Sequence, residues 1–342
     1  MGDQESLPGW VSPDLVRRVL EWTMEPTHGT EAQHPGGATG RFDARIVGCY
    51  LYPITRYGYP PPAQDTPRYV EELHALGFRS IELEGIREQH LKAVHAMSDE
   101  LRRQLDRLEV SVPYFCVVLA GLTSLDSAVR EANLELFELG CRTARTLGAS
   151  GVLDNGPLPP YEFAADVPIV RHFDEHVIAR AGIPASLDWQ AYWQDLIATY
   201  RKACDIAARF GLDYLLHPSI GVLCSTTDGF LHFHQAVDRE NLRFNLDTAN
   251  FYLQRDHLPM ALVRLGTHID YIHLADNRGL QPEHLPLGDG AIDWEVFFET
   301  LARTGYRGRF GIDIGGTESG VSDLDRAYVA AARYVEERIG AA

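Results

Sequence analysis

The chain has 342 residues, of which 45% are hydrophobic and 23% charged, enough apolar sequence for a large core and typical of a globular protein. Its formal net charge of −17 repels phosphate backbones and anionic headgroups, which argues against a nucleic-acid partner and against a membrane surface. Five cysteines without a C-x-x-C pair argue against a disulfide framework or a thiolate zinc site, so we expect buried thiols in a reducing cytoplasm.

The first 44 residues differ from the rest. A short amphipathic stretch, 13–22, precedes a Gly-, Thr- and His-rich tract that predicts a loop. We find no apolar segment typical of a secretory signal and no run of about 18 apolar residues that would cross a membrane. We therefore expect an N-terminal extension, 1–44, followed by one domain, 45–342.

That domain alternates short apolar runs with longer segments of helical periodicity, as parallel strands joined by helices do. We expect strands at 45–53, 80–85, 111–120, 150–156, 213–221, 242–252, 271–279 and 308–316. We expect helices from Thr66 and at 87–109, 124–148, 188–210 and 322–339, with a long lid-like loop at 157–186. Eight successive strand–helix units predict a single (β/α)₈ TIM barrel, and no strand is followed by the Gly-x-Gly-x-x-Gly of a dinucleotide fold.

Polar side chains gather where the expected strands end. In such a barrel, the C-terminal ends of the strands face the active site. The residues at these ends are Glu82, Glu84, Asp154, Asn155, His217, Asp247, Asn250, His273, Asp276, Asn277, Arg278 and Asp313. We expect the functional residues mainly within this set.

Four consecutive strands of the C-terminal half offer His217, Asp247, His273 and Asp313. Each stands in an otherwise apolar strand, where a charged group costs free energy unless a partner offsets its desolvation. Two carboxylates and two imidazoles suit a divalent cation of intermediate hardness. We therefore predict a metal site, with Mn²⁺ ranked first and Co²⁺, Zn²⁺ and Mg²⁺ as alternatives.

Motifs in the same half resemble those of the xylose-isomerase-like barrels, the sugar phosphate isomerase/epimerase family. The segments that carry the resemblance are HPSIG, FNLDTANF, YIHLADNRG with HLPLGDGAIDW, and TGYRGRFGIDI. The resemblance covers about residues 45–340 and implies a metal-dependent barrel enzyme acting on a sugar.

The resemblance also implies roles for single residues. Asp247 and His273 match metal ligands of the family, and Arg278 matches an arginine that contacts substrate oxygens. His217 and Asp313 stand where many members have metal-binding glutamates, which are the paired acid and base groups of ketose 3-epimerases. Asn250, which replaces the usual histidine after the strand 6 aspartate, is expected to bind substrate. These replacements favour elimination over a two-base epimerisation.

Other residues are candidates for proton transfer and substrate contact. A metal that binds a carbonyl or enediolate oxygen acidifies the adjacent C–H, and a nearby base removes the proton. We select His284, in the loop after 271–279, and the strand-end residues Glu84 and Asp154 as acid or base candidates. Tyr52 and Tyr114, near strand ends, are expected to stack against the sugar.

The enolate formed in this way has two fates. It can expel a β-leaving group, as in inosose dehydratases and the catalytic subunits of C-glycoside deglycosidases, which the resemblance includes. It can also be reprotonated by an isomerase or epimerase. We favour the lyase, acting on a sugar, keto-glycoside or cyclitol, with the isomerase or epimerase as the alternative. An endonuclease IV-like repair enzyme shares the barrel, but the acidic charge makes it a distant alternative. We expect a small-molecule substrate, and a second copy or a small partner subunit as possible protein partners.

Overall fold

The structure, a computed structural model, describes residues 40–163 and 175–340. The expected extension therefore lies outside the described residues except for 40–44, and the expected loop 157–186 lies outside them over 164–174. Within the described residues, no helix has the length and apolar composition needed to cross a membrane.

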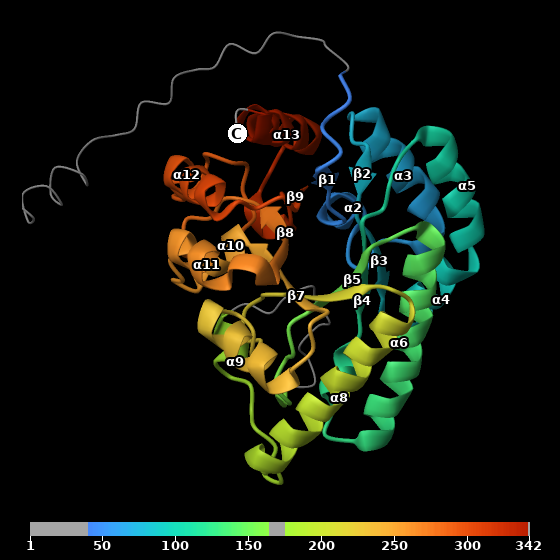
Figure 1. The fold of residues 1–342 in the computed structure, drawn as a ribbon, viewed down its shortest axis with the longest axis vertical. Helices are drawn as coiled ribbons and strands as arrows, with labels where there is room; N and C mark the ends of the chain where they lie inside the picture. Colours follow the sequence, from blue (N-terminus) through green and yellow to red (C-terminus); the bar gives the residue numbers. More distant parts are fainter. Residues whose placement is uncertain (1–39, 164–174, 341–342) are drawn as a thin grey trace, which may run out of the picture. The chain divides into compact units, whose positions relative to one another are not determined.

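The core of the domain is a parallel sheet that closes on itself (Figure 1). Its strands are β1 (Ile46–Gly48), β2 (Ser80–Ile81), β3 (Leu83–Ile86), β4 (Tyr114–Val118), β5 (Gly151–Asn155), β6 (Asp213–His217), β7 (Leu242–Asp247), β8 (Ile269–Leu274) and β9 (Arg309–Ile312). The order around the sheet is β2-β1-β9-β8-β7-β6-β5-β4-β3. The two end segments, β2 and β3, are consecutive in the chain, with only Glu82 between them. They form one interrupted strand, so the nine segments make the eight strands of a closed barrel.

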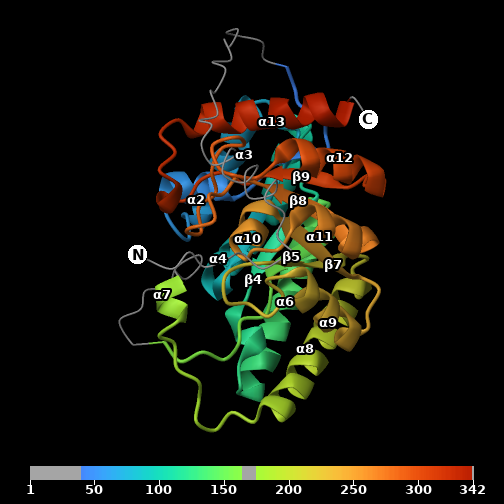
Figure 2. The same cartoon turned by 90° about the vertical axis from the view of Figure 1, so that its left-hand side faces the viewer.

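Helices surround the strands in both views (Figures 1 and 2). They are α2 (Leu51–Tyr57), α3 (Thr66–Ala75), α4 (Arg87–Ala96), α5 (Ser98–Leu108), α6 (Ser127–Leu147), α7 (Glu175–Ile178), α8 (Trp189–Arg209), α9 (Thr227–Val237), α10 (Thr248–Leu253), α11 (Leu258–Leu265), α12 (Trp294–Thr304) and α13 (Leu324–Gly340). Short 3-10 turns lie at Ala63–Asp65, Ala120–Thr123, Gly266–His268 and Thr317–Ser319. The last helix, α13, packs on β1 and β9 and so covers one side of the barrel (Figure 2).

Local sequence explains several helix ends. Asp126 and Asp188 cap α6 and α8 by accepting backbone N–H groups of the first turn, which satisfies donors that have no partner inside the helix. Gly148 closes α6 at a φ of +83°, a conformation that glycine adopts without strain. The two longest helices therefore begin and end close to the residues that the pattern predicts.

Two apolar layers stabilise the barrel. The larger lies between the strands and the helices, and the smaller fills the inside of the barrel. The inner layer contains Val47, Cys49, Tyr114, Cys116, Leu153, Leu215 and Tyr271. The five cysteines are all buried and unpaired.

The eight strands and the closed barrel are confirmed, but several expected bounds are wrong. The first strand ends at Gly48, and α2 begins within the expected strand 45–53. The strand expected at 242–252 ends at Asp247, where the Asp247 side chain caps α10. The helix expected at 87–109 is divided at Met97. In each case a side-chain cap or a local turn ends an element that hydrophobic periodicity alone would continue.

Candidate metal centre

The four expected ligands lie together at one end of the barrel. His217 ends β6, Asp247 ends β7, His273 lies in β8, and Asp313 directly follows β9. Neighbouring parallel strands bring these positions to one level, since Asp247 pairs with His273 in the ladder. One donor atom from each residue lies within 4.8 Å of the donor atoms of the other three, and all four side chains are buried.

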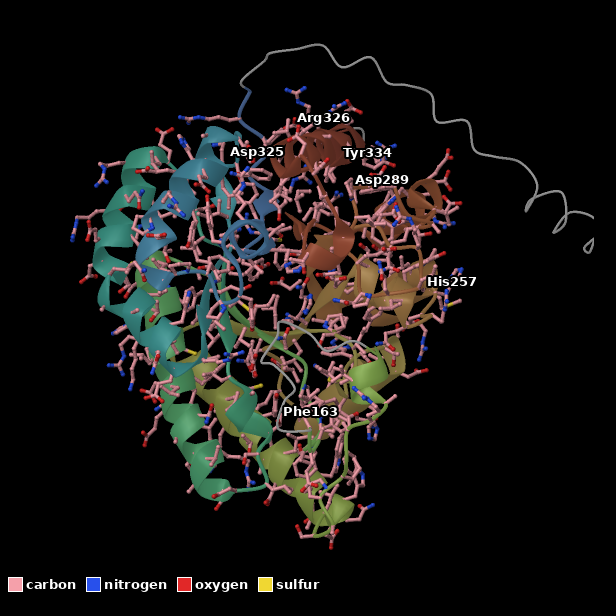
Figure 3. All side chains as sticks on the ribbon, turned by 180° about the vertical axis from the view of Figure 1, so that it is seen from behind. Phe163, His257, Asp289, Asp325, Arg326 and Tyr334 are labelled. Carbon is pink, nitrogen blue, oxygen red and sulfur yellow. The ribbon has the colours of Figure 1, made fainter. Side chains whose placement is uncertain are left out.

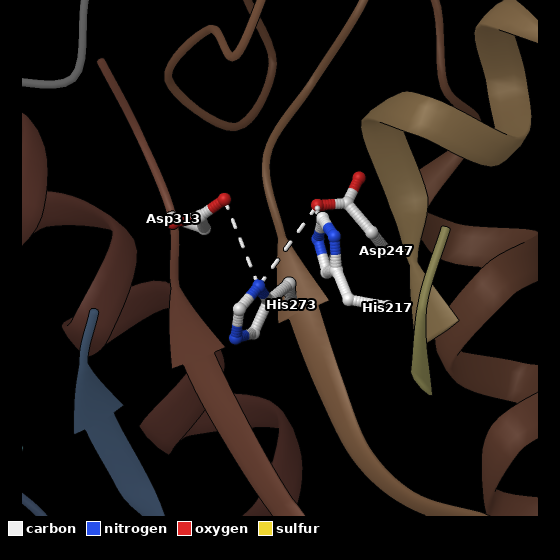
Figure 4. A group of neighbouring side chains, drawn as sticks. All are labelled: His217, Asp247, His273 and Asp313. Carbon is white, nitrogen blue, oxygen red and sulfur yellow. Dashed lines mark hydrogen bonds and ion pairs between the residues drawn. The ribbon is translucent and has the colours of Figure 1, made fainter. Parts of the chain in front are cut away.

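His273 lies at the centre of the group, between Asp313 and Asp247 (Figure 4). Its Nε2 lies 3.1 Å from Oε2 of Glu82, so the imidazole donates to this carboxylate. Its Nδ1 lies 3.7 Å from Oδ2 of Asp313 and 4.0 Å from Oδ2 of Asp247, too far for a hydrogen bond. Glu82 thus selects the tautomer that presents the Nδ1 lone pair to the two carboxylates, as residues behind metal-bound histidines commonly do.

Asp247 joins the centre to the start of α10. Its Oδ1 accepts the N–H of Asn250 at 2.7 Å, and its Oδ2 lies 3.1 Å from Nε2 of His217. This second distance is the spacing of about 3 Å expected for two donors that share one cation at about 2.1 Å each. The helix cap therefore fixes the orientation of the carboxylate toward the site.

His284 reaches the same centre from a loop. The chain between β8 and α12 folds back, with Asp276 paired to Leu285 and His284 paired to Gly315 in short bridges. The Asp276 carboxylate accepts the N–H groups of Gly288 and Trp294, among others, which holds this loop in place. Nε2 of His284 consequently lies 3.5 Å from Oδ2 of Asp247 and 3.7 Å from Oδ2 of Asp313.

The charges of the centre stabilise one another. Burial alone would raise the pKa of Asp247, but the imidazoles of His284 and His217 lower it well below 3.8. Burial alone would lower the pKa of His273, but Glu82 and Asp313 raise it to about 9. Burial lowers the pKa of His217 despite its bond to Asp247. Asp247 is thus held ionised, and the ring of His273 favours a positive charge beside it, either a proton or a metal.

The donor set fits a divalent cation. Nδ1 of His273 and Nδ1 of His217 are buried and make no hydrogen bond with the described residues, an arrangement that costs free energy in a protein interior. A cation among the four donors would neutralise both aspartates and use the free lone pair of His273. Histidine and aspartate donors together suit Mn²⁺, Co²⁺ or Zn²⁺ better than Ca²⁺.

A pocket with an empty volume of about 440 Å³ opens beside the centre. Its polar walls are Glu82, Glu84, Asn155, His217, His273 and Asp313. Apolar side chains of α2 and of the strand ends, including Leu51, Ile54 and Val118, form the remaining wall together with Tyr59. Three of the four expected ligands form part of this lining, so a small molecule bound in the pocket would lie against the centre.

Three expected residues lie elsewhere. Asp154 points outward, where it accepts a hydrogen bond from the Tyr214 hydroxyl at 3.3 Å, and burial raises its pKa well above 3.8. Tyr114 lies at the opposite end of the barrel, with its hydroxyl bonded to Asp270 at the start of β8. Neither residue is placed to act as base or sugar wall, which corrects those expectations.

Tyr52 is the third. The chain turns into α2 directly after β1, so its hydroxyl donates to Asp325 on α13 at 2.5 Å. Figure 3 labels Asp325 among the outer helices. Tyr52 is 1% exposed and its ring packs on Tyr328, which makes it part of the outer core rather than a wall of the pocket.

The other expected substrate residues lie near the centre without lining the pocket. Asn250 donates its side-chain amide to the Pro218 carbonyl at 3.0 Å and so braces the segment after β6. The Arg278 side chain is 53% exposed and pairs with Glu283 at 3.3 Å. Their roles in substrate binding remain predictions.

Three pocket residues were not assigned a role from the sequence. Glu82 contacts His273, Asn155 pairs with His217 in the ladder, and Tyr59 lines the opposite wall. Alternation along a strand could have indicated Glu82, since it shares a face with Glu84. Tyr59 follows α2 in a connection that the periodicity does not reveal.

Comparison with known proteins agrees with this geometry. A family model described as the xylose isomerase-like TIM barrel matches residues 70–338, most of the chain. The chain belongs to this family.

Proteins with sequences similar to this chain include carbohydrate epimerases. The chain is 25% identical over 126 residues to D-psicose 3-epimerase of Ruminiclostridium cellulolyticum, a match that covers 36% of the chain and only 41% of that enzyme. It is 28% identical over 239 residues to L-ribulose-5-phosphate 3-epimerase of Salmonella paratyphi A, covering 69% of the chain and 73% of that enzyme.

Solved structures share the fold. The D-allulose 3-epimerase of Methylomonas sp. superposes with a TM-score of 0.63 at 18% identity, covering 87% of the chain and 99% of that structure. A probable 3-DHS dehydratase from Bacillus anthracis gives a TM-score of 0.60 at 15% identity, covering 85% of the chain and 98% of that structure. At this identity, the likeness establishes the barrel alone.

Proposed function

We propose that this protein is a metal-dependent enzyme that transfers a proton at the carbon next to the ketone of a sugar, and that it is an epimerase or isomerase. The observation that carries the proposal is the buried quartet of His217, Asp247, His273 and Asp313, three of which line a pocket. The names of the two sequence relatives compared above, both 3-epimerases, support this reading better than the lyase favoured from the sequence.

We assign a separate role in proton transfer to the quartet, to Glu84 and to His284. A divalent cation held by the quartet, with Mn²⁺ ranked first on its donor types, would polarise the ketone oxygen and stabilise the enediolate. Glu84, on β3 in the wall of the pocket, is our candidate for the group that accepts the proton. His284, which approaches the quartet from the loop after β8, is our candidate for the group that returns a proton to the sugar or protonates an oxygen.

The supporting residues act through the ligands. Glu82 orients His273, and Asp276 holds the loop that carries His284. We propose Arg278 and Asn250 as contacts of the sugar hydroxyls when substrate is bound. We further propose a cytoplasmic protein, since the five thiols are buried and unpaired, that assembles with a second copy or a small subunit.

A β-elimination is the second candidate. It is favoured by the ligand set, because His217 and Asp313 stand where a pair of glutamates would supply two bases in the ketose epimerases that the chain resembles. One base and one acid suffice for elimination, and Glu84 and His284 could supply them.

Deuterium exchange separates the two candidates. The protein with Mn²⁺ is incubated in D₂O with D-psicose, L-ribulose 5-phosphate or a 3-keto-D-glucoside, and the products are followed by NMR. An epimerase incorporates deuterium next to the ketone and changes the configuration there, whereas a lyase releases water or the aglycone. If no substrate in this panel exchanges its proton, the proposed function fails.

Two substitutions of a carboxyl group by a neutral amide, Glu84→Gln and Asp154→Asn, form a matched pair of variants. Glu84→Gln should lower the exchange rate by at least about a hundredfold, as loss of a general base does. Asp154→Asn changes a carboxyl on a nearby strand that faces away from the pocket and is held protonated by burial, so the rate should stay within about threefold of wild type. Equal losses in both variants would remove Glu84 as the base.

A further inference from the structure

Four described residues other than glycine have a positive φ, namely Arg87, Glu109, Asp238 and Arg255. Glu109 and Asp238 are the residues that close α5 and α9, and Arg255 follows the end of α10. A left-handed residue directly after a helix is a common way to end it. Arg87 is different, because it stands at the start of a helix.

Arg87 occupies a sharp turn at the pocket end of a strand. β3 ends at Ile86 and α4 begins at Arg87, with no residue between them. The φ of Arg87 is +57°, a conformation that costs free energy for a long side chain and that glycine or asparagine would adopt more easily. Such a strained strand-to-helix turn raises one side chain above the end of the sheet, as it does for the nucleophile of other α/β enzymes.

The Arg87 side chain lies next to the pocket. Its guanidinium carbon is 5.6 Å from the ring centroid of Tyr59, and Tyr59 and Glu84 both line the pocket. With the described residues the guanidinium makes no hydrogen bond or ion pair, whereas its neighbour Glu88 pairs with Lys92. A guanidinium placed against an aromatic ring keeps its planar N–H edges available for oxygen acceptors.

We propose that Arg87 is a substrate-binding residue, whose guanidinium donates to a pair of oxygen atoms at the end of the sugar away from the metal ligands. The inference rests on the proposed function and adds a recognition site to it. Backbone strain at a bulky residue persists where the surrounding fold maintains it, and it is concentrated at ligand sites. Two vicinal hydroxyls or a phosphate present the oxygen pair that the fork of an arginine fits.

The test separates binding from folding. Arg87→Gly removes the side chain and relieves the backbone, so the melting temperature should be equal to or above that of wild type. KM for the sugar should rise at least tenfold, with kcat changed less than threefold, and Arg87→Lys should recover part of the loss. Asp238→Gly is the matched control, since it relieves the same conformation at an exposed helix end and should leave KM unchanged.

Two probes identify the group that Arg87 holds. A larger rise of KM for L-ribulose 5-phosphate than for D-psicose assigns the phosphate, and equal rises assign hydroxyls. The inference would be overturned, with the proposed function intact, if Arg87→Gly and Asp238→Gly had the same KM for every substrate that is turned over. Absence of proton exchange in the wild-type protein would instead refute the proposed function, and the inference with it.

Discussion

At the scale of single residues, the proposed centre depends on groups outside its set of four donors. Glu82 illustrates this, because it is 2% exposed, interrupts the strand between β2 and β3, and accepts the Nε2 hydrogen of His273. Its carboxylate decides which nitrogen of the imidazole faces Asp247 and Asp313. The four ligands expected from the sequence therefore do not include Glu82, the residue that orients the imidazole of His273.

Replacing Glu82 should weaken metal binding without removing a ligand. In Glu82→Gln a neutral amide replaces the carboxylate behind His273, and loss of such a partner typically costs about 10–100-fold in metal affinity. Titration calorimetry with Mn²⁺ measures the change, with Asp154→Asn as the control on the outer face. An affinity equal to wild type would show that Glu82 does not orient the ligand.

Residue identity alone does not tell which side of a strand a side chain occupies. The sequence places Asp154 and Asn155 together at a strand end, but a shift of one position turns a side chain to the opposite face. Pairing of Asn155 with His217 directs Asn155 inward and Asp154 toward the helices. The grouping of the four expected ligands could be predicted because each stands alone in an apolar strand, whereas the position of His284 depends on the loop held by Asp276.

At the scale of elements, β9 passes so close to the centre that one of its positions admits no side chain. Gly311 in β9 lies beside His273, and a Cβ built there would be 2.5 Å from Cys49 Sγ, 2.5 Å from the Tyr271 hydroxyl and 2.8 Å from His273 Cδ2. The strand can therefore pass His273 only without a side chain at this position.

Gly311→Ala should destabilise the barrel and disturb the ligand. Overpacking of a tight interior typically costs about 1–3 kcal/mol, so we expect a lower melting temperature by calorimetry and weaker Mn²⁺ binding. Gly340→Ala, in α13 with no atom within 4 Å of the added Cβ, is the control and should melt as wild type does. An unchanged melting temperature in Gly311→Ala would show that β9 accommodates the added methyl group without loss of stability.

The turn from β3 into α4 also makes the free energy of unfolding depend on pH. Burial lowers the pKa of His90, which accepts the N–H of Ile86, from 6.5 to about 4. Between these values the unfolded chain binds a proton at His90 and the folded chain does not, so the free energy of unfolding falls as the pH falls through this range. At about 1.4 kcal/mol per pKa unit, the contribution is of order 1–3 kcal/mol.

Urea unfolding at pH 7 and pH 5 measures this effect. His90→Asn keeps an acceptor for Ile86 but does not titrate, so its stability should decline less between the two pH values than that of wild type. The same decline in both proteins would assign the acid sensitivity to other groups.

At the scale of the whole molecule, binding of the cation should stabilise the barrel, because the four ligands come from four different strands. A ligand that binds only the folded state at a hundred times its Kd adds about 2.7 kcal/mol. We therefore expect Mn²⁺ to raise the melting temperature of wild type by several degrees. His273→Ala should show no rise, and a rise of equal size in that variant would place the cation elsewhere.

The fold was more predictable than its boundaries for a physical reason. Eight apolar runs separated by helical segments permit few arrangements other than a closed barrel. The ends of elements depend on single side chains, such as the Asp247 carboxylate that caps α10, and on turns such as the one at Arg87. Tyr52 was misplaced for this reason, since it lies in α2 and not at the end of β1.

The four expected ligands lie in or directly after β6 to β9, whereas most other walls of the pocket, including Leu51, Glu84 and Val118, come from the half of the barrel that contains β1 to β5. The proposed ligands and most of the pocket wall are thus encoded in separate stretches of one gene. Mutations in the first half that spare Glu82 and Glu84 can change what the pocket accepts while leaving the proposed ligand quartet intact. A library at the other wall positions within residues 46–155 is consequently the economical route to new substrates on this scaffold.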